Sequence, residues 1–348
     1  MHRCIRSHII HNGTKQTRSV SMTGDIPTPL EDVRDLILNH PVVDLPKDYN
    51  SDGSMRRSKY GRIERLGEWM AACQRREKPK LEKSTIALFA GTHGLAKHGV
   101  SVSASGATEV RVKALQEGKL AANGLAAMSN SALRVFELAL ELPTKDIAEA
   151  PAMTAQECAS TIAFGMEAIA ESPDVLAIGV LGVGGGTAAA AVANGLYGGD
   201  PQYWVRAGQG VPEEVNGARA DVIQKALQAH RHHLNSPLEI LQHLGGRELA
   251  ACVGAIIAAR HQGIPVILDG FATAVAAGVV HAIEPRAITH VIAGQATNRP
   301  AHQAILDRLE MEPLLDLQME AGEGMGGMLA MPLLQAASIV GNSGDTEA

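Results

Sequence analysis

Residues 175–193 read VLAIGVLGVGGGTAAAAVA, and this stretch decides the fold. Val175–Leu181 is a short apolar run rich in β-branched residues, which is typical of a buried strand. The glycines that follow predict a tight turn, and the alanines of residues 188–193 predict a helix. The uncharged run is long enough to cross a bilayer. Its glycines and alanines nevertheless favour strand, turn and helix over a membrane span.

The same alternation recurs along the chain. Four further apolar runs are each followed by turn-forming residues and a helix-like stretch, at residues 85–90, 133–139, 265–269 and 288–293. Ser236, Pro237 and Glu239 form a capping box that starts a helix, and residues 248–260 predict a buried helix. Strands alternating with helices favour a parallel sheet covered on both faces. We therefore predict an α/β fold with a doubly wound parallel sheet of about six strands.

The two ends of the chain differ from this core. The region before about residue 84 is charged and helical in character, and apolar residues after Gly324 recur at helical spacing. We predict a small helical subdomain built from residues 25–84 and 324–348, and a large α/β nucleotide-binding domain at residues 85–323. Residues 1–24 predict a disordered extension, with a transit peptide or a true start at Met22 as alternatives.

Composition excludes several classes of protein. A net charge of −6 and a pI near 6.2 argue against a nucleic-acid-binding protein. The four cysteines lie far apart without a CxxC pair, so reduced thiols in a cytoplasmic protein are expected. The tract His230-Arg231-His232-His233 lacks a clean zinc spacing and predicts the last turn of a helix. We predict no metal, no cofactor, no membrane and no nucleic acid.

The turn after residue 181 is a candidate anion site. In parallel sheets, ligands bind beyond the carboxyl ends of the strands. Backbone N–H groups of residues 182–187, together with a helix N-terminus, favour a phosphate. The turn lacks the lysine of a Walker motif and the third glycine of a dinucleotide fingerprint. A close-packed turn without a ligand is the alternative.

Glu323 is the candidate catalytic group. It lies in the sequence AGEGMGG at residues 321–327, where glycines on both sides let the backbone approach a ligand. A carboxylate in a partly apolar pocket can act as a general base. A solvated loop glutamate is the alternative. His93 follows another predicted strand, and either a pocket-lining or a structural role suits it.

These motifs together resemble the nicotinate-nucleotide–dimethylbenzimidazole phosphoribosyltransferases, which act in cobalamin lower-ligand activation. The resemblance runs from about Gly61 to Ala337. Its most specific parts are LDGF at residues 268–271, EPLLDL at 312–317, GEG at 322–324 and AMP at 330–332.

The resemblance implies a reaction, a fold and an assembly. Nicotinate mononucleotide donates its phosphoribosyl group to dimethylbenzimidazole, giving α-ribazole 5′-phosphate and nicotinate, with Glu323 as the base. The implied assembly is a homodimer. The residues implied to hold the donor phosphate and ribose are Gly182, Gly184, Gly185, Gly186, Thr187, Gly208, Arg219, Thr297 and Gly322. The residues implied to border the acceptor pocket are Ser101, Glu109, Ala321 and His93.

Several positions depart from the family pattern. Val180 stands where the family usually has an acid, Arg219 replaces a lysine, and Arg299 replaces a glutamate. Other departures are at Thr92, Gly185, Gln209, Glu109 and Thr297. The alternatives are therefore a weak or inactive paralogue that binds a nucleotide, or a phosphoribosyltransferase with another azole or a phenol as acceptor. On fold alone, an unrelated nucleotide-using enzyme such as a dehydrogenase is a further alternative.

Overall fold

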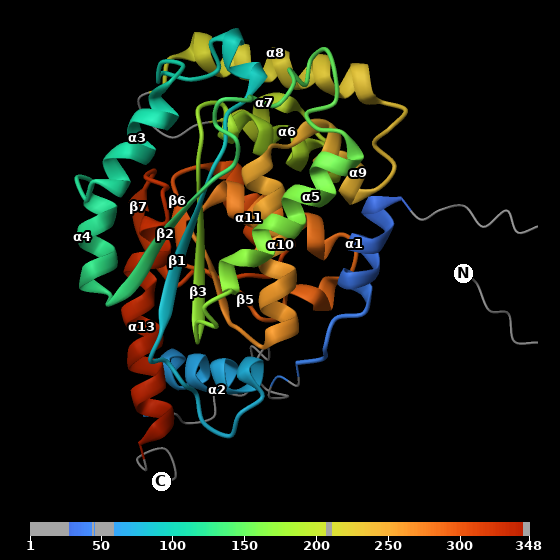
Figure 1. The fold of residues 1–348 in the computed structure, drawn as a ribbon. Helices are drawn as coiled ribbons and strands as arrows, with labels where there is room; N and C mark the ends of the chain where they lie inside the picture. The colour runs from blue at the N-terminus through green and yellow to red at the C-terminus, as the bar shows by residue number, and fades with distance from the viewer. Residues whose placement is uncertain (1–27, 44, 46–58, 207–210, 344–348) are drawn as a thin grey trace, which may run out of the picture.

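A parallel sheet forms the centre of the molecule in the computed structural model, which describes residues 28–43, 45, 59–206 and 211–343 (Figure 1). Its strand order is β2-β1-β3-β4-β5. A parallel pair, β6-β7, lies beside it. The strands are β1 (Ser84–Ala90), β2 (Ser131–Glu137), β3 (Val175–Leu181), β4 (Val266–Leu268), β5 (Val291–Ala293), β6 (Gln295–Thr297) and β7 (Leu315–Met319). The predicted α/β class and parallel sheet are confirmed, with five strands in the main sheet.

One face of the sheet packs on a large apolar core. Phe89, Leu176 and Ile178 point into this core, as the alternation of side chains along a strand requires. The helices that contribute to it include α5 (Ala155–Gly165), α6 (Gly185–Tyr197), α8 (Glu213–His230), α9 (Pro237–Leu244), α10 (Arg247–Gln262) and α11 (Phe271–His281). The helix predicted from Ser236 is confirmed, because the Ser236 hydroxyl accepts a hydrogen bond from the Glu239 N–H at 3.3 Å.

The opposite face packs on a second core. Ile86, Leu88 and Ala177 point to this side. The helices here are α2 (Arg62–Gln74), α3 (Ala107–Gln116), α4 (Ala121–Met128) and α13 (Met325–Asn342). Helices α2 and α13 cross closely, since a Cβ on Gly67 would stand 2.8 Å from the Ala337 carbonyl oxygen. Helices therefore cover both faces of the sheet, as predicted.

Three α-helices and three 3₁₀-helices complete the fold of the described residues. They are α1 (Pro29–Leu38), η1 (Gly94–His98), η2 (Met166–Ile169), α7 (Pro201–Val205), η3 (Pro285–Ile288) and α12 (Pro300–Arg308). Helix α1 packs on α5, whereas α2 packs on α13 (Figure 1). The division into two domains stays a prediction, and the predicted N-terminal extension lies outside the described residues.

Several strand boundaries differ from the predictions by one to three residues. Residues 288–290 precede the strand rather than belong to it, because η3 extends to Ile288. The second strand ends at Glu137, and Ala139 has a φ of +51°, which no strand residue adopts. Apolar residues at these ends are buried or partly buried although they lie outside the strands, so an apolar run alone predicts strands that are too long.

Candidate active site

The turn after β3 leads directly into α6. Gly184 has a φ of +92°, which favours glycine, and Gly185 is already the first residue of the helix. Gly185 and Gly186 thus belong to the first turn of α6. The Gly185 N–H donates to the Gly182 carbonyl at 3.1 Å, whereas no backbone partner is found for the Gly186 N–H among the described residues. The predicted strand–turn–helix is confirmed, and its helix N-terminus lies at the carboxyl end of the sheet.

A buried pair of side chains lies beneath this turn. The His93 Nε2 is 3.0 Å from a Glu248 carboxylate oxygen, and the two side chains are 0% and 1% exposed. Glycines surround the pair: a Cβ on Gly91 would stand 2.5 Å from Glu248, and one on Gly246 would stand 2.3 Å from His93. The His93 ring is therefore closed to solvent and supports the turn from below. The predicted place of His93 at the border of the acceptor pocket stays a prediction.

The loop that carries Glu323 is held by a buried carboxylate. Asp269, which follows β4, accepts hydrogen bonds from the Gly324 N–H at 2.9 Å and the Gly326 N–H at 2.7 Å. These N–H groups begin α13, so Asp269 caps that helix. Burial raises the pKa of Asp269 to about 6, against the lowering effect of these hydrogen bonds. Asp269 thereby fixes the backbone on both sides of Met325 and positions the preceding glutamate.

Glu323 itself is largely enclosed. Its side chain is 12% exposed and forms an ion pair with Arg111 of α3. Gly324 rests on β3, because a Cβ on Gly179 would stand 2.5 Å from the Gly324 nitrogen. The carboxylate therefore lies above the carboxyl ends of the central strands, next to a cation. This geometry suits a base that takes a proton from a ligand bound above the strand ends.

Two other predicted donor-binding residues are held in place by side-chain contacts. The Thr297 hydroxyl and N–H both approach the His302 Nδ1, at 3.0 and 3.2 Å. Because the N–H donates, this Nδ1 is an acceptor, and burial lowers the pKa of His302 to about 4. Arg219 on α8 donates from Nε to the Val100 carbonyl at 2.8 Å, one residue before Ser101.

The other predicted residues spread along the same loops. Ser101 accepts a hydrogen bond from the Ser103 N–H, and Glu109 is exposed in the first turn of α3. The Ala321 carbonyl accepts a hydrogen bond from Gln295 at 3.3 Å. A Cβ on Gly322 would stand 3.6 Å from Asp269, and Thr187 is buried in α6. Gly208 lies outside the described residues.

Four further residues belong to this region that the sequence analysis did not assign. They are Arg111, Glu248, Asp269 and Arg299. Asp269 had a signal, since it follows a predicted strand and precedes a glycine. Glu248 had none, because it reads as a helix residue far from His93 in sequence.

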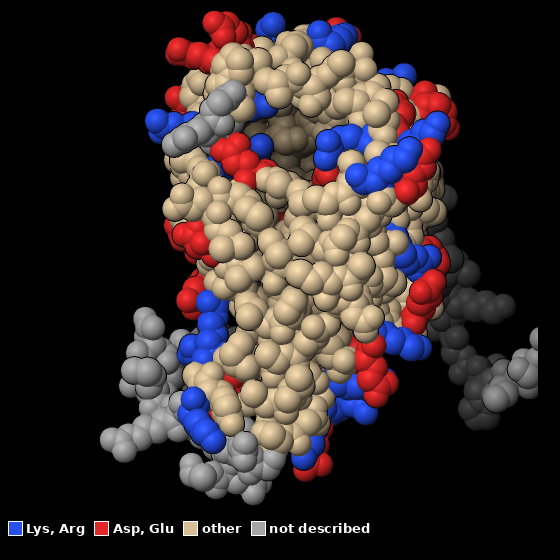
Figure 2. Space-filling model, turned by 90° about the vertical axis from the view of Figure 1, so that its left-hand side faces the viewer, with Lys and Arg blue, Asp and Glu red and all other residues tan. Residues whose placement is uncertain are grey.

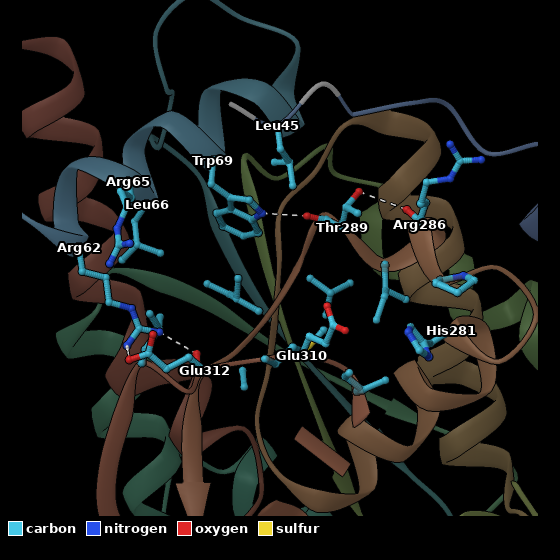
Figure 3. A pocket seen from close by; sticks show the side chains of 18 residues that line it. Leu45, Arg62, Arg65, Leu66, Trp69, His281, Arg286, Thr289, Glu310 and Glu312 are labelled. Atoms are coloured by element: carbon cyan, nitrogen blue, oxygen red, sulfur yellow. Dashed lines mark hydrogen bonds and ion pairs between the residues drawn. The ribbon is translucent and has the colours of Figure 1, made fainter. Parts of the chain in front are cut away.

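The hollow that these loops surround opens on one side of the molecule. Figure 2 shows it near the top of the face, at the end where the strands finish, with charged side chains on its rim. A separate cavity of about 550 Å³ lies near α2 and the edge strand β5 (Figure 3). Its lining includes Arg62, Trp69 and Thr289, and none of the predicted site residues. The Trp69 indole donates to the Thr289 carbonyl at 2.9 Å.

Within the described ranges, no group of three or more His, Cys, Asp and Glu side chains is placed to hold a metal ion. His230 of the HRHH tract is the last residue of α8, and it is buried with its Nε2 2.8 Å from the Ile147 carbonyl. None of the described helices has the length and apolar character needed to cross a membrane.

The chain is similar to known phosphoribosyltransferases in sequence and in structure. A family model described as phosphoribosyltransferase matches residues 50–347. The nicotinate-nucleotide–dimethylbenzimidazole phosphoribosyltransferase of Rhizobium meliloti is 40% identical over 315 residues, covering 89% of this chain and 93% of the relative. That of Methylocella silvestris is 43% identical over 277 residues, covering 80% and 81%. The crystal structure of CobT from Thermus thermophilus has a TM-score of 0.76 at 32% identity, covering 90% and 96%.

Proposed function

The chain belongs to the nicotinate-nucleotide–dimethylbenzimidazole phosphoribosyltransferase family, and from this premise we propose that Glu323 is the base of its reaction. The enzyme transfers the phosphoribosyl group of nicotinate mononucleotide to dimethylbenzimidazole or a related base, in the assembly of the cobalamin nucleotide loop. The observation that carries the assignment is the enclosed carboxylate of Glu323, fixed above the strand ends by Asp269.

The arrangement suggests how the reaction proceeds. The donor phosphate binds at the first turn of α6, where the Gly186 N–H and Arg219 offer hydrogen-bond donors. The acceptor N–H lies against Glu323 in place of the Arg111 contact, and the carboxylate takes that proton. The other ring nitrogen then attacks the anomeric carbon of the ribose. The bond to the pyridinium breaks, and nicotinate leaves with the electron pair.

The test is an assay for released nicotinate. Wild-type protein mixed with nicotinate mononucleotide and dimethylbenzimidazole should release nicotinate. Glu323→Gln should lower kcat by about 10²–10⁴-fold, the usual contribution of a general base, while donor binding persists. Glu320→Gln changes an exposed glutamate of the same loop and should leave the rate near that of the wild type. An active Glu323→Gln protein would refute the assignment.

A different acceptor is the second candidate, and Val180 is the observation that favours it. This residue near the end of β3 is partly buried and packs on the apolar core, where the family pattern has an acid. The acceptor side of the site therefore has one polar group fewer. A panel of azoles and phenols, assayed with wild type and Val180→Glu, separates the candidates. Preference for another acceptor, reversed by Val180→Glu, would support this second candidate.

We further infer that the protein acts as a homodimer in the cytoplasm. Val110, Met128 and Ile339 are 68%, 61% and 72% exposed, on α3, α4 and α13. Helices α4 and α13 are joined because the Gln335 amide donates to the Ser129 carbonyl at 2.7 Å. Figure 2 shows a largely uncharged band along this side, continuous with the hollow. Such a surface supports a protein interface.

A further inference from the structure

Two guanidinium groups face the donor side of the site without an acidic partner. Arg219 comes from α8, and Arg299 is the residue before α12. The Arg299 Nη1 lies 3.4 Å from where a Cβ on Gly186 would stand, so it lies over the first turn of α6. In the ranges that the structure describes, neither arginine forms an ion pair with an Asp or Glu side chain.

The burial of Arg219 and Arg299 makes their two positive charges unfavourable unless an anion binds near them. Both side chains are partly buried, and burial lowers the pKa of both. The charge of Arg299 further lowers the pKa of Arg219, and the charge of Glu320 acts in the opposite sense on the pKa of Arg299. Partly desolvated like charges repel each other, and an anion between them removes that cost.

Arg219 is oriented by contacts that leave part of its guanidinium available. Its Nε donates to the Val100 carbonyl at 2.8 Å, and its Nη1 donates to the Asn216 side chain at 3.2 Å. Among the described contacts, the Arg299 side chain makes no hydrogen bond, so its whole guanidinium group can turn toward a ligand. The Gly186 N–H, in the first turn of α6 next to Arg299, adds a backbone donor.

We propose that Arg299 is a second cationic ligand for the donor phosphate, acting with Arg219 across the first turn of α6. The inference rests on the proposed function. Two planar forks can each offer paired N–H donors to phosphate oxygens, which makes the site selective for a phosphate dianion. Arg299 is thus a specificity-determining residue rather than a catalytic one.

The experiment compares donor binding with and without the phosphate. Calorimetric titration of wild type and Arg299→Ala with nicotinate mononucleotide should show about tenfold to hundredfold weaker binding by the variant, the range of a charged hydrogen bond. Nicotinate riboside, which lacks the phosphate, should bind both proteins equally. In turnover, Arg299→Ala should raise the KM for the donor by a similar factor with little change in kcat.

Two matched variants keep the result interpretable. Arg299→Lys retains a charge without the fork and should fall between wild type and Arg299→Ala. Arg286→Ala removes an arginine from η3, 79% exposed, and should bind the mononucleotide as the wild type does. Circular dichroism of each variant checks that it folds.

The outcomes separate the inference from the function on which it rests. Equal binding of the mononucleotide by wild type and Arg299→Ala would overturn the role of Arg299, whatever the turnover. The same loss for the riboside would also overturn it, because a general packing defect would then be the cause. A clear phosphate-dependent difference without product from any acceptor would support Arg299 and contradict the activity. No binding of mononucleotide by wild type would overturn both.

Discussion

Glu323 has a φ of +63°, in the left-handed region that side chains rarely adopt. This conformation costs a residue with a Cβ about 1–2 kcal/mol relative to its ordinary regions. Gly322 and Gly324 flank it, and Asp269 fixes the following N–H groups, so the surrounding structure imposes the conformation. A glycine would adopt this φ without strain. The presence of a glutamate therefore points to a functional requirement for its carboxylate.

A pair of substitutions measures this cost. We expect Glu323→Gly to be more stable than Glu323→Ala by about 1 kcal/mol, because only glycine relieves the positive φ. Both lack the Arg111 ion pair and both should be inactive, so the comparison isolates the backbone. Urea unfolding provides the free energies of unfolding. Equal stability of the two variants would show that the loop relaxes and that the strain is absent.

The sequence predicts the residues of this site better than their contacts. Glu323 could be proposed from its glycine-rich motif and the family resemblance. Its ion pair with Arg111 could not, since 212 positions separate them and an exposed helix arginine carries no signal of its own. Arg299 was visible only as a departure from the family pattern. Its place over Gly186 depends on how the segment after β6 returns across α6, which no local pattern encodes.

At the scale of elements, local chemistry determines much of what forms. Val175–Leu181 has the predicted bounds, and Ser236 caps the predicted helix. The close crossing of α5 and α10 was not predicted, although glycines make it possible. A Cβ on Gly254 would stand 1.8 Å from the Ile162 carbonyl oxygen, and one on Gly165 would stand 2.0 Å from that of Ala251. A helix glycine read singly looks only like a weak helix former.

Alanine at these glycines tests the importance of the crossing. Gly254→Ala should destabilise the protein by about 1–3 kcal/mol, because the added methyl group meets backbone that must shift. Gly124→Ala is the matched control in α4, where a Cβ would meet nothing within 4 Å, and it should stabilise by about 0.5–1 kcal/mol. Thermal and urea unfolding give both values. Similar effects at the two positions would mean that α5 and α10 separate easily.

At the scale of the whole molecule, buried histidines connect stability to pH. Burial lowers the pKa of His290 to about 3, that of His302 to about 4 and that of His243 to about 4. Each is near 6.5 in the unfolded chain, so below that pH the unfolded state binds more protons. The contribution of these three neutral histidines to the stability of the folded state is therefore complete above pH 6.5 and is lost as the pH falls toward 4. Asp269, with its raised pKa of about 6, acts in the opposite sense between about pH 4 and 6.

We therefore expect the unfolding temperature to fall between pH 7 and pH 4.5. His290→Gln should reduce this fall, because the amide can still donate to the Ile256 carbonyl, which lies 3.0 Å from Nε2, and does not titrate. The difference between wild type and variant should amount to a few kcal/mol over this range, on the order expected for two or more pKa units. Parallel pH profiles for the two proteins would show that His290 does not contribute.

The uncharged side of the molecule is the surface that we propose as the dimer interface. Ile339 lies one helical turn after Gln335, whose side chain reaches the carbonyl next to Met128, so the two apolar side chains flank the α4–α13 contact. A charge placed there has no partner in the chain, and in a dimer it would be buried at the interface. We expect Ile339→Glu to convert a dimer into monomers in sedimentation equilibrium, and to lower activity if the partner encloses the hollow. Val42→Glu adds the same charge at a 67% exposed valine after α1, away from α4 and α13, and should leave the dimer intact. A monomeric wild type would contradict the interface, and a dimer unaffected by Ile339→Glu would place it on another face.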